Sequence, residues 1–101
     1  MAAKKELGGK AVVVTGGGRG IGRAHCLQLA GAGAAVVVND VDQAEAGNTA
    51  AEIHRRGGRA IADGSDIGTV SGAARAVAAC RTEFGHIDAM VANAGIVRDR
   101  T

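Results

Sequence analysis

The sequence lacks tyrosine, tryptophan and proline, and it contains a single phenylalanine among its 101 residues. Aromatic side chains supply much of the buried area of many cores, so this core must be built from alanine, valine, isoleucine and leucine. Without a tyrosine, the chain has no phenolic hydroxyl that could act as a general acid. The 17 glycines interrupt the chain where proline does not, and we expect a thin core with little stability of its own.

Neither charge nor hydropathy indicates a nucleic-acid or membrane partner. Twelve Lys and Arg against ten Asp and Glu give a formal net charge of +2, and the basic residues are spread along the chain. The longest apolar stretch, residues 30–38, is well short of the roughly 18 residues that a membrane span needs. Residues 1–10 carry charge without an apolar segment behind them, so we expect a cytoplasmic protein without a secretory signal.

Residues that often carry catalysis or bind metals are few and scattered. Cys26 and Cys80 lie far apart without metal-ligand spacing, which predicts neither a disulfide nor a metal site. His25 and His54 fall in predicted helices, and His86 falls in the loop before the last predicted strand. We interpret all three histidines as packed or solvated, and we predict no catalytic residue in this chain.

Apolar residues alternate between buried runs and helical periodicity along the chain. Strands are expected at residues 11–14, 35–38, 59–62 and 87–92. Helices are expected between them, over residues 20–32, 42–56 and 69–84. Strands that alternate with helices form parallel sheets through right-handed crossovers. The sequence therefore predicts an α/β fold, a partial Rossmann (doubly wound) βαβαβαβ arrangement with a parallel four-stranded sheet in the order 3-2-1-4.

Two predicted helices show a clear apolar or small face. The helix after Asp42, its expected N-cap, has Ala46, Thr49, Ala50 and Ile53 on one side. The helix at 69–84 has a wider apolar face. Its members are Val70, Ala73, Ala74, Val77, Ala78 and Phe84.

A glycine-rich turn joins the first predicted strand to the first helix. Residues 15–22 read Thr-Gly-Gly-Gly-Arg-Gly-Ile-Gly, with Gly16, Gly20 and Gly22 in Gly-x-x-x-Gly-x-Gly spacing. Small residues let backbone N–H groups approach a diphosphate, and the helix N-terminus supplies partial positive charge. The turn therefore predicts a phosphate site, although glycines spaced in this way also serve tight turns and close helix packing without any ligand.

Asp40 stands at the end of the second predicted strand, eighteen residues after Gly22. An acidic side chain there can accept hydrogen bonds from the ribose hydroxyls of a dinucleotide. Its negative charge favours NAD, because it would repel a 2′-phosphate. Arg19 beside the turn would offset part of that repulsion, so NADP stays open, and Asp40 as a capping or loop residue is the alternative interpretation.

Three motifs in this order resemble the short-chain dehydrogenase/reductase family, over residues 10–99. Residues 15–22 match its Thr-Gly-x-x-x-Gly-x-Gly turn, residues 66–67 match an acidic position followed by an apolar one, and residues 93–95 match the end of Asn-Asn-Ala-Gly. The resemblance implies that Asp66 and Ile67 flank the adenine. The residues that it places at the cofactor are Gly16, Gly18, Arg19, Gly20, Ile21, Asp40, Asp66, Ile67, Asn93, Ala94 and Gly95.

The chain departs from the family pattern in two places. Ala92 replaces the first asparagine of the last motif, a mild change that weakens one sheet-stabilising hydrogen bond of the family pattern. The family's catalytic Ser, Tyr and Lys lie beyond the fourth strand, and no position of this sequence receives them. The resemblance implies that residues 1–101 are the amino-terminal part of one NAD(P)-binding Rossmann domain, truncated after the fourth strand and inactive alone.

The resemblance implies an NAD(P)-dependent oxidoreductase that transfers hydride between nicotinamide and an alcohol or carbonyl. Residues 96–101 resemble members that act on 3-oxoacyl or 3-hydroxyacyl thioesters, a substrate that only a full-length parent would bind. The alternative is a non-catalytic nucleotide-binding module or a defective subunit. A methyltransferase-type Rossmann domain is disfavoured by Thr15, the third glycine and residues 93–95. We also expect self-association through the exposed edge of the fourth strand.

Overall fold

The two central strands are runs of valine that are buried along their whole length. A computed structural model of the chain describes residues 5–93. In it, β1 (Ala11–Thr15) and β2 (Ala35–Asn39) are parallel neighbours, and every residue of both strands is buried. Branched side chains suit a strand that is covered on both faces. The pairing of Thr15 with Asn39 brings the ends of the two strands to the same sheet edge.

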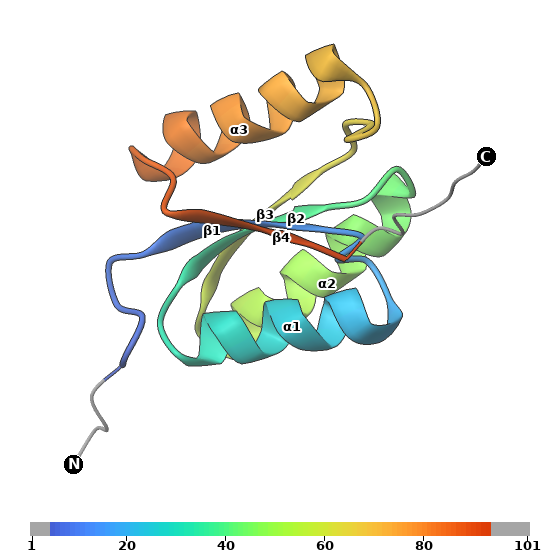
Figure 1. The fold of residues 1–101 in the computed structure, drawn as a ribbon. Coiled ribbons are helices and arrows are strands. Elements are labelled where there is room, and N and C mark those ends of the chain that lie inside the picture. The colour runs from blue at the N-terminus through green and yellow to red at the C-terminus, as the bar shows by residue number, and fades with distance from the viewer. Residues whose placement is uncertain (1–4, 94–101) are drawn as a thin grey trace.

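Helices cover both faces of the sheet, with two on one face and one on the other (Figure 1). The outer strands are β3 (Arg59–Asp63), beside β2, and β4 (Ala89–Ala92), beside β1. The helices α1 (Gly20–Gly31) and α2 (Gln43–Arg55) lie together, and α3 (Val70–Phe84) lies opposite. All strand pairs are parallel, in the order β3-β2-β1-β4. The predicted fold class and strand order are confirmed.

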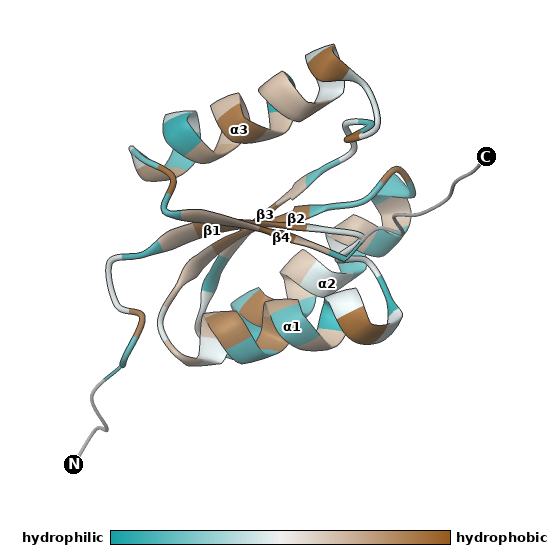
Figure 2. Cartoon of the chain, in the orientation of Figure 1, coloured by the Kyte–Doolittle hydropathy of each residue, from teal (hydrophilic) through white to brown (hydrophobic). Residues whose placement is uncertain are grey.

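Each face of the sheet has its own core of small aliphatic side chains, and the strands form an apolar layer between the helices (Figure 2). The larger core lies beneath α1 and α2. Its buried residues are Val12, Val14, Cys26, Ala30, Ala34, Val36, Val38, Ala46, Ala50, Ile53 and Ala60. The smaller core lies beneath α3. Its buried residues are Ala11, Val13, Val37, Ala76 and Cys80. Because a buried alanine contributes far less than a buried isoleucine or valine, the smaller core is the weaker one.

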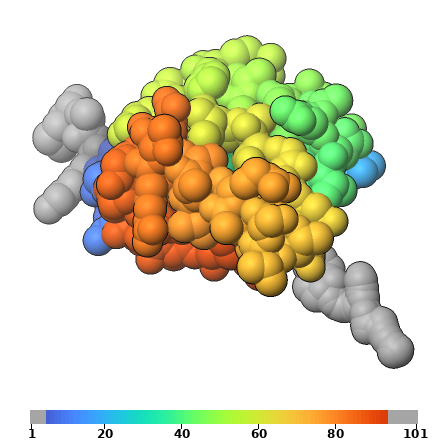
Figure 3. All heavy atoms as spheres, turned by 90° about the horizontal axis from the view of Figure 1, so that it is seen from above, coloured from blue at the N-terminus to red at the C-terminus, as the bar shows by residue number. Residues whose placement is uncertain are grey.

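Except for Phe84, which packs against the smaller core, the predicted apolar face of α3 is wrong as a core face. The buried residues of α3 are Gly72, Ala76 and Cys80, whereas Val70 is 91% exposed. Contact through the smallest side chains lets the helix approach the sheet closely, which turns most of the bulkier apolar residues outward. A shallow depression on α3, the orange helix that crosses the face in Figure 3, is lined by Ala73, Ala74, Val77, Ala78, Arg81 and Thr82.

The element boundaries differ from the predicted ones by one or two residues. β4 begins at Ala89 instead of residue 87, because Asp88 is occupied with the start of β1. The Asp88 carboxylate accepts the Ala11 N–H at 2.8 Å, and the Asp88 N–H donates to the Ala11 carbonyl at 2.8 Å. The bond from the Ala11 N–H, aided by His86 at 2.9 Å, lowers the pKa of Asp88.

Candidate functional site

The carboxyl ends of the four strands bring most of the predicted site residues to one edge of the sheet. The turn that follows β1, Asp40 after β2, the loop after β3 and Asn93 after β4 all lie there. Ligands of open α/β sheets bind at this edge. Ala94 and Gly95, which complete the last predicted motif, lie outside the described residues 5–93.

Glycine is required in the turn after β1 for two separate reasons. Gly16 and Gly20 have φ angles of +63° and +60°, a region that side-chain-bearing residues rarely adopt. At Gly22, a Cβ atom would overlap the carbonyl oxygen of Gly16, so only glycine lets α1 begin this close to the strand. The Gly17 N–H donates to the Asn39 carbonyl at 2.9 Å, which fixes the turn to the end of β2.

The first turn of α1 has no cap from its own side chains. Its N-cap residue, Arg19, makes no side-chain capping hydrogen bond, and no acidic residue lies in the first turn. The N–H groups that begin a helix have no acceptor within the helix, and the helix dipole makes this end partially positive. Exposed Arg19 adds a charge, 3.6 Å from the Asp42 carboxylate, and Ile21 is 73% exposed beside it. This end of α1 suits a phosphate group.

The Asp40 side chain points toward the turn. Its Oδ2 accepts the Gly18 N–H at 3.0 Å, and its Oδ1 accepts the Asp42 N–H at 3.0 Å. Asp42, not Asp40, caps α2, because its Oδ1 accepts the Glu45 N–H at 3.2 Å, which confirms the predicted N-cap. Each carboxylate oxygen can accept more than one hydrogen bond, so Asp40 retains capacity for a ligand's hydroxyl groups.

Asn39 is a residue of the candidate site that the sequence motifs did not predict. It is buried, and its Nδ2 donates to Asp63 Oδ2 at 2.8 Å and to the Ser65 carbonyl at 3.0 Å. The Ser65 hydroxyl donates to Asp63 Oδ1 at 3.0 Å. These bonds tie β2 to the loop after β3 and so fix one wall of the edge. A buried amide that ends a run of valines was the available signal.

The predicted adenine-flanking residues lie in the loop between β3 and α3. Asp66 is exposed, and its Oδ1 accepts the Gly68 N–H at 2.9 Å. Ile67 is half-buried and packs against the smaller core. Thr69 ends the loop as the N-cap of α3, with its Oγ1 accepting the Gly72 N–H at 2.9 Å. Asp66 and Ile67 therefore both have contacts within the protein: a hydrogen bond for Asp66 and core packing for Ile67.

Thr15 joins the ends of β1 and β4. Its hydroxyl donates to the Val91 carbonyl at 3.4 Å, and its Oγ1 accepts the Asn93 N–H at 3.0 Å. The Asn93 Nδ2 is buried and has no acceptor among residues 5–93. The turn motif at 15–22 thus meets Asn93, the first residue of the last motif, through the Thr15 side chain.

The described part of the chain offers no metal-binding group and no reactive thiol. No cluster of three or more His, Cys, Asp or Glu that could hold a metal occurs within residues 5–93. Cys26 lies beneath the turn, and burial raises the pKa of its thiol to about 12. Burial also raises the pKa of Cys80, whose thiol donates to the His86 carbonyl at 3.3 Å. Within the same residues, no helix has the length and hydropathy to cross a bilayer.

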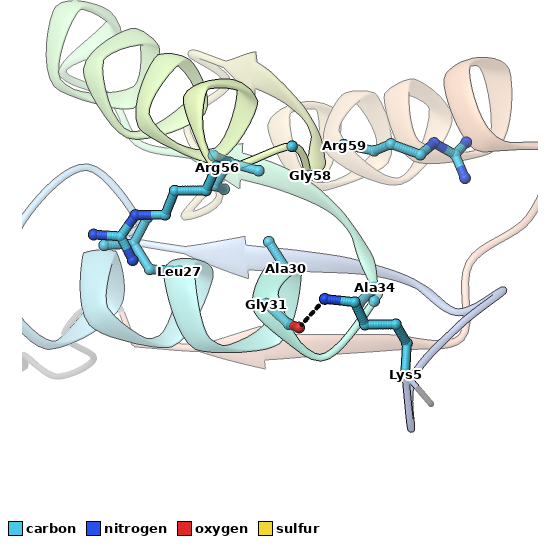
Figure 4. Close-up of a pocket in the computed structure, with 11 residues that line it drawn as sticks. Lys5, Leu27, Ala30, Gly31, Ala34, Arg56, Gly58 and Arg59 are labelled. Carbon is cyan, nitrogen blue, oxygen red and sulfur yellow. Dashed lines mark hydrogen bonds between the residues drawn. The ribbon is translucent and has the colours of Figure 1, made fainter. Parts of the chain in front are cut away.

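A cavity of about 180 Å³ lies between the ends of α1 and α2, at the opposite edge of the sheet (Figure 4). The cationic side chains that line it have partners within the protein. Lys5 donates to the Gly31 carbonyl at 3.0 Å, and Arg56 pairs with Glu52 at 2.8 Å. Arg59 lies over the Phe84 ring. A cation at a helix C-terminus stabilises the helix, so this cavity has a structural explanation.

Known proteins share both the sequence and the fold. The family profile described as short chain dehydrogenase matches residues 10–101. A short-chain type dehydrogenase/reductase of Mycobacterium tuberculosis is 45% identical over 101 aligned residues, covering 91% of this chain and 35% of that protein. The peroxisomal hydratase-dehydrogenase-epimerase of Neurospora crassa is 44% identical, covering 96% of this chain and 10% of that protein. The chain thus spans about a third of the first relative and a tenth of the second.

A solved structure shows the same arrangement. A 7α-hydroxysteroid dehydrogenase complexed with NADH and 7-oxo glycochenodeoxycholic acid is 32% identical and has a TM-score of 0.82, covering 86% of this chain and 34% of that one. The family profile extends over most of the sequence and includes the turn, Asp40 and Asn93. The chain therefore belongs to the short-chain dehydrogenase family.

Proposed function

We propose that residues 1–101 supply the cofactor-binding part of an NAD(P)-dependent oxidoreductase that transfers hydride between nicotinamide and an alcohol or carbonyl substrate. The observation that carries the proposal is the uncapped N-terminus of α1 beside a carboxylate that faces it. A dinucleotide needs this pair of features, because its diphosphate seeks N–H donors and its ribose hydroxyls seek an acceptor. The bound nicotinamide would supply the hydride chemistry.

The proposed contacts follow the order of the cofactor along the edge. Gly16, Gly18 and Gly20 would let the turn approach the diphosphate, with Arg19 adding charge and Ile21 lying toward the nicotinamide. Asp40 would accept hydrogen bonds from the ribose. Asp66 and Ile67 would flank the adenine, with their loop held in place by the Asn39 network. Asn93, Ala94 and Gly95 would pass beneath the cofactor.

We propose NAD, with NADP as the weaker cofactor, because the Asp40 carboxylate would repel a 2′-phosphate. The dehydrogenase of known structure that binds NADH supports this choice. Calorimetric titration of the chain with NAD and NADP tests it. NAD should bind more tightly by about tenfold, since repulsion between the Asp40 carboxylate and a neighbouring 2′-phosphate is worth about 1.4 kcal/mol.

Asp40 is tested with a matched pair of variants. Asp40→Asn keeps an acceptor for the Gly18 N–H but removes the charge. It should reduce the difference between the affinities for NAD and for NADP. Asp40→Ala removes both the charge and the hydrogen bond to Gly18, and it should lower the affinity for both cofactors. Unchanged affinities in both variants would remove Asp40 from the site.

A second candidate is a nucleotide-binding module without chemistry of its own. It is favoured by the absence of tyrosine from the sequence, because hydride transfer to a carbonyl needs a proton donor at the developing alkoxide. We expect the 101-residue chain to bind NADH but not to oxidise it when a ketone or a 3-oxoacyl thioester is added. Turnover measured by NADH absorbance would overturn the expected inactivity.

The substrate that we propose for the longer enzyme is a 3-oxoacyl or 3-hydroxyacyl thioester. The support is the resemblance of residues 96–101, and NMR titration of the NADH-loaded chain with such a thioester tests it. Shifts at residues 96–101 are expected with the thioester and not with a simple ketone. No shift with either compound would contradict this substrate.

We further propose a cytoplasmic protein that associates with itself through β4. This strand pairs with β1, its outer side has no partner strand among residues 5–93, and Met90 is 41% exposed. An open edge with apolar side chains favours association. Light scattering should show dimers or larger species, and Met90→Lys should reduce them.

The proposed cytoplasmic location is tested with a fluorescent fusion in cells. The peroxisomal relative makes peroxisomes the informative alternative.

A further inference from the structure

A hydroxyl group of α2 holds the backbone of the glycine turn from below. Thr49 is completely buried, and its Oγ1 donates to the Gly18 carbonyl at 3.1 Å. The same Oγ1 accepts a hydrogen bond from Arg23 Nη1 at 3.1 Å. One threonine side chain therefore connects α2, the turn and α1.

The donor and the acceptor in these two hydrogen bonds are fixed by the chemistry of Arg23 and of the Gly18 carbonyl. A guanidinium group can only donate, so Thr49 Oγ1 must act as the acceptor toward Arg23. The single hydroxyl proton of Thr49 is then available for the Gly18 carbonyl, which can only accept. Arg23 thus keeps the hydroxyl proton directed at the turn.

The bond to the Gly18 carbonyl also determines where the Arg19 N–H points. Both groups belong to the same peptide unit, which is planar and trans. In such a unit the C=O and the N–H point in opposite directions. Because the Gly18 carbonyl is turned inward to buried Thr49, the Arg19 N–H faces away from α2, at the first turn of α1.

Gly18 is held on its other side as well. Its N–H donates to Asp40 Oδ2 at 3.0 Å, and a Cβ atom at this position would lie 2.7 Å from Glu45 Cβ. The residue is therefore packed tightly against the start of α2. With glycine on both sides of the preceding peptide, the turn has little local preference of its own, so these side-chain bonds select its conformation.

We propose that Thr49 is a positioning residue for the diphosphate of the dinucleotide. Its hydroxyl orients the Gly18–Arg19 peptide so that the Arg19 N–H is presented to the phosphate and the carbonyl is kept away from it. Without the hydroxyl, the carbonyl loses its inward partner, and the peptide is free to rotate its oxygen toward a negatively charged ligand. This inference rests on the proposed function, and it assigns Thr49 no contact with the cofactor.

The test compares variants that differ in the hydroxyl group. Thr49→Val removes the hydroxyl and keeps the shape, whereas Thr49→Ser keeps the hydroxyl. Thr49→Ala paired with Thr49→Ser repeats the comparison with a difference of one oxygen atom, in case the valine variant does not fold. Calorimetry then gives the affinity of each variant for NAD, for ADP and for adenosine, which has no phosphate.

We expect the variants without the hydroxyl to bind NAD and ADP about tenfold more weakly, with adenosine changed by less than about twofold. Thr49→Ser should restore the affinity of the unmodified chain. Equal loss for adenosine, NAD and ADP would overturn the inference in favour of a purely structural role. Undiminished binding of NAD by Thr49→Val would overturn it as well.

A ligand-free measurement separates this inference from the proposed function. The NMR signal of the Arg19 amide should shift in Thr49→Val and stay in place in Thr49→Ser. If the unmodified chain bound no nucleotide, the proposed function and the cofactor role of Thr49 would fall together. A shifted Arg19 amide would then still show that Thr49 orients the peptide, and an unshifted one would contradict that step too.

Discussion

Three helices begin at the same edge of the sheet, and one of them begins differently. Asp42 caps α2 and Thr69 caps α3, each with a side-chain oxygen that accepts a backbone N–H. The N-cap of α1 is Arg19, which supplies no acceptor. A capped helix has already satisfied part of its free N–H groups. The start of α1 therefore keeps N–H donors that an anion could use, whereas side chains occupy a donor at the start of α2 and of α3.

The turns before α1 and α3 are otherwise built alike. In each helix the third residue is a glycine, Gly22 or Gly72, and a Cβ atom there would overlap a backbone carbonyl of the preceding turn. The carbonyl belongs to Gly16 in one case and to Asp66 in the other. Close approach of strand and helix is therefore a general feature of this fold. The cap, and not the glycine, distinguishes the proposed phosphate site.

The largest effect is expected from Gly22→Ala. The added methyl group would overlap the Gly16 carbonyl, so the turn must move, and the free energy of unfolding should fall by about 1–3 kcal/mol. NAD affinity should fall by more than about tenfold, because the N–H groups would be displaced from the proposed diphosphate site. Urea unfolding and calorimetry measure the two quantities.

Gly72→Ala is the matched control for this substitution. It should cost similar stability, because its methyl group would overlap the Asp66 carbonyl, but it leaves the turn after β1 intact. A smaller loss of NAD affinity than in Gly22→Ala is therefore expected. Equal losses in the two variants would mean that the two turns are not different in function.

The next effect is expected from giving α1 the cap that it lacks. Arg19→Asp places a carboxylate at an N-cap position, which should stabilise the helix by up to about 1 kcal/mol. The same carboxylate would occupy the N–H groups and repel the diphosphate, so NAD affinity should fall by about tenfold or more. Arg19→Gln, which removes the charge without adding a capping carboxylate, should lose less NAD affinity than Arg19→Asp. Thermal unfolding and calorimetry are the measurements, and a tighter complex in Arg19→Asp would refute the phosphate site.

The smallest effect on binding is expected from removing a cap that α3 has. Thr69→Ala frees the Gly72 N–H and should lower the free energy of unfolding by about 1 kcal/mol. NAD affinity should change by less than about twofold, because this helix end lies outside the proposed diphosphate site. Thr69→Ser should keep both the free energy of unfolding and the NAD affinity of the unmodified chain. A large loss of affinity in Thr69→Ala would show that the two helix ends do not differ as proposed.

The sequence determined the order of the elements, the parallel sheet and the glycine turn, because these follow from periodicity and local spacing. It also determined the cap of α2, since Asp42 acts on a residue three positions away. The face of α3 could not be predicted in this way. Its apolar residues cover a wide arc, and only packing decided that the narrow side with Gly72, Ala76 and Cys80 meets the sheet.

The remaining details of the candidate site depend on residues that are distant in the chain. Asn93 meets Thr15 across 78 positions, Asn39 reaches Asp63 across 24, and Thr49 reaches Gly18 across 31. A local pattern carries no information about such pairs, because the bonds exist only after the strands have been placed side by side. Sequence alone therefore placed the glycines and acidic residues of the site, whereas the tertiary structure decided which buried polar groups hold them in position.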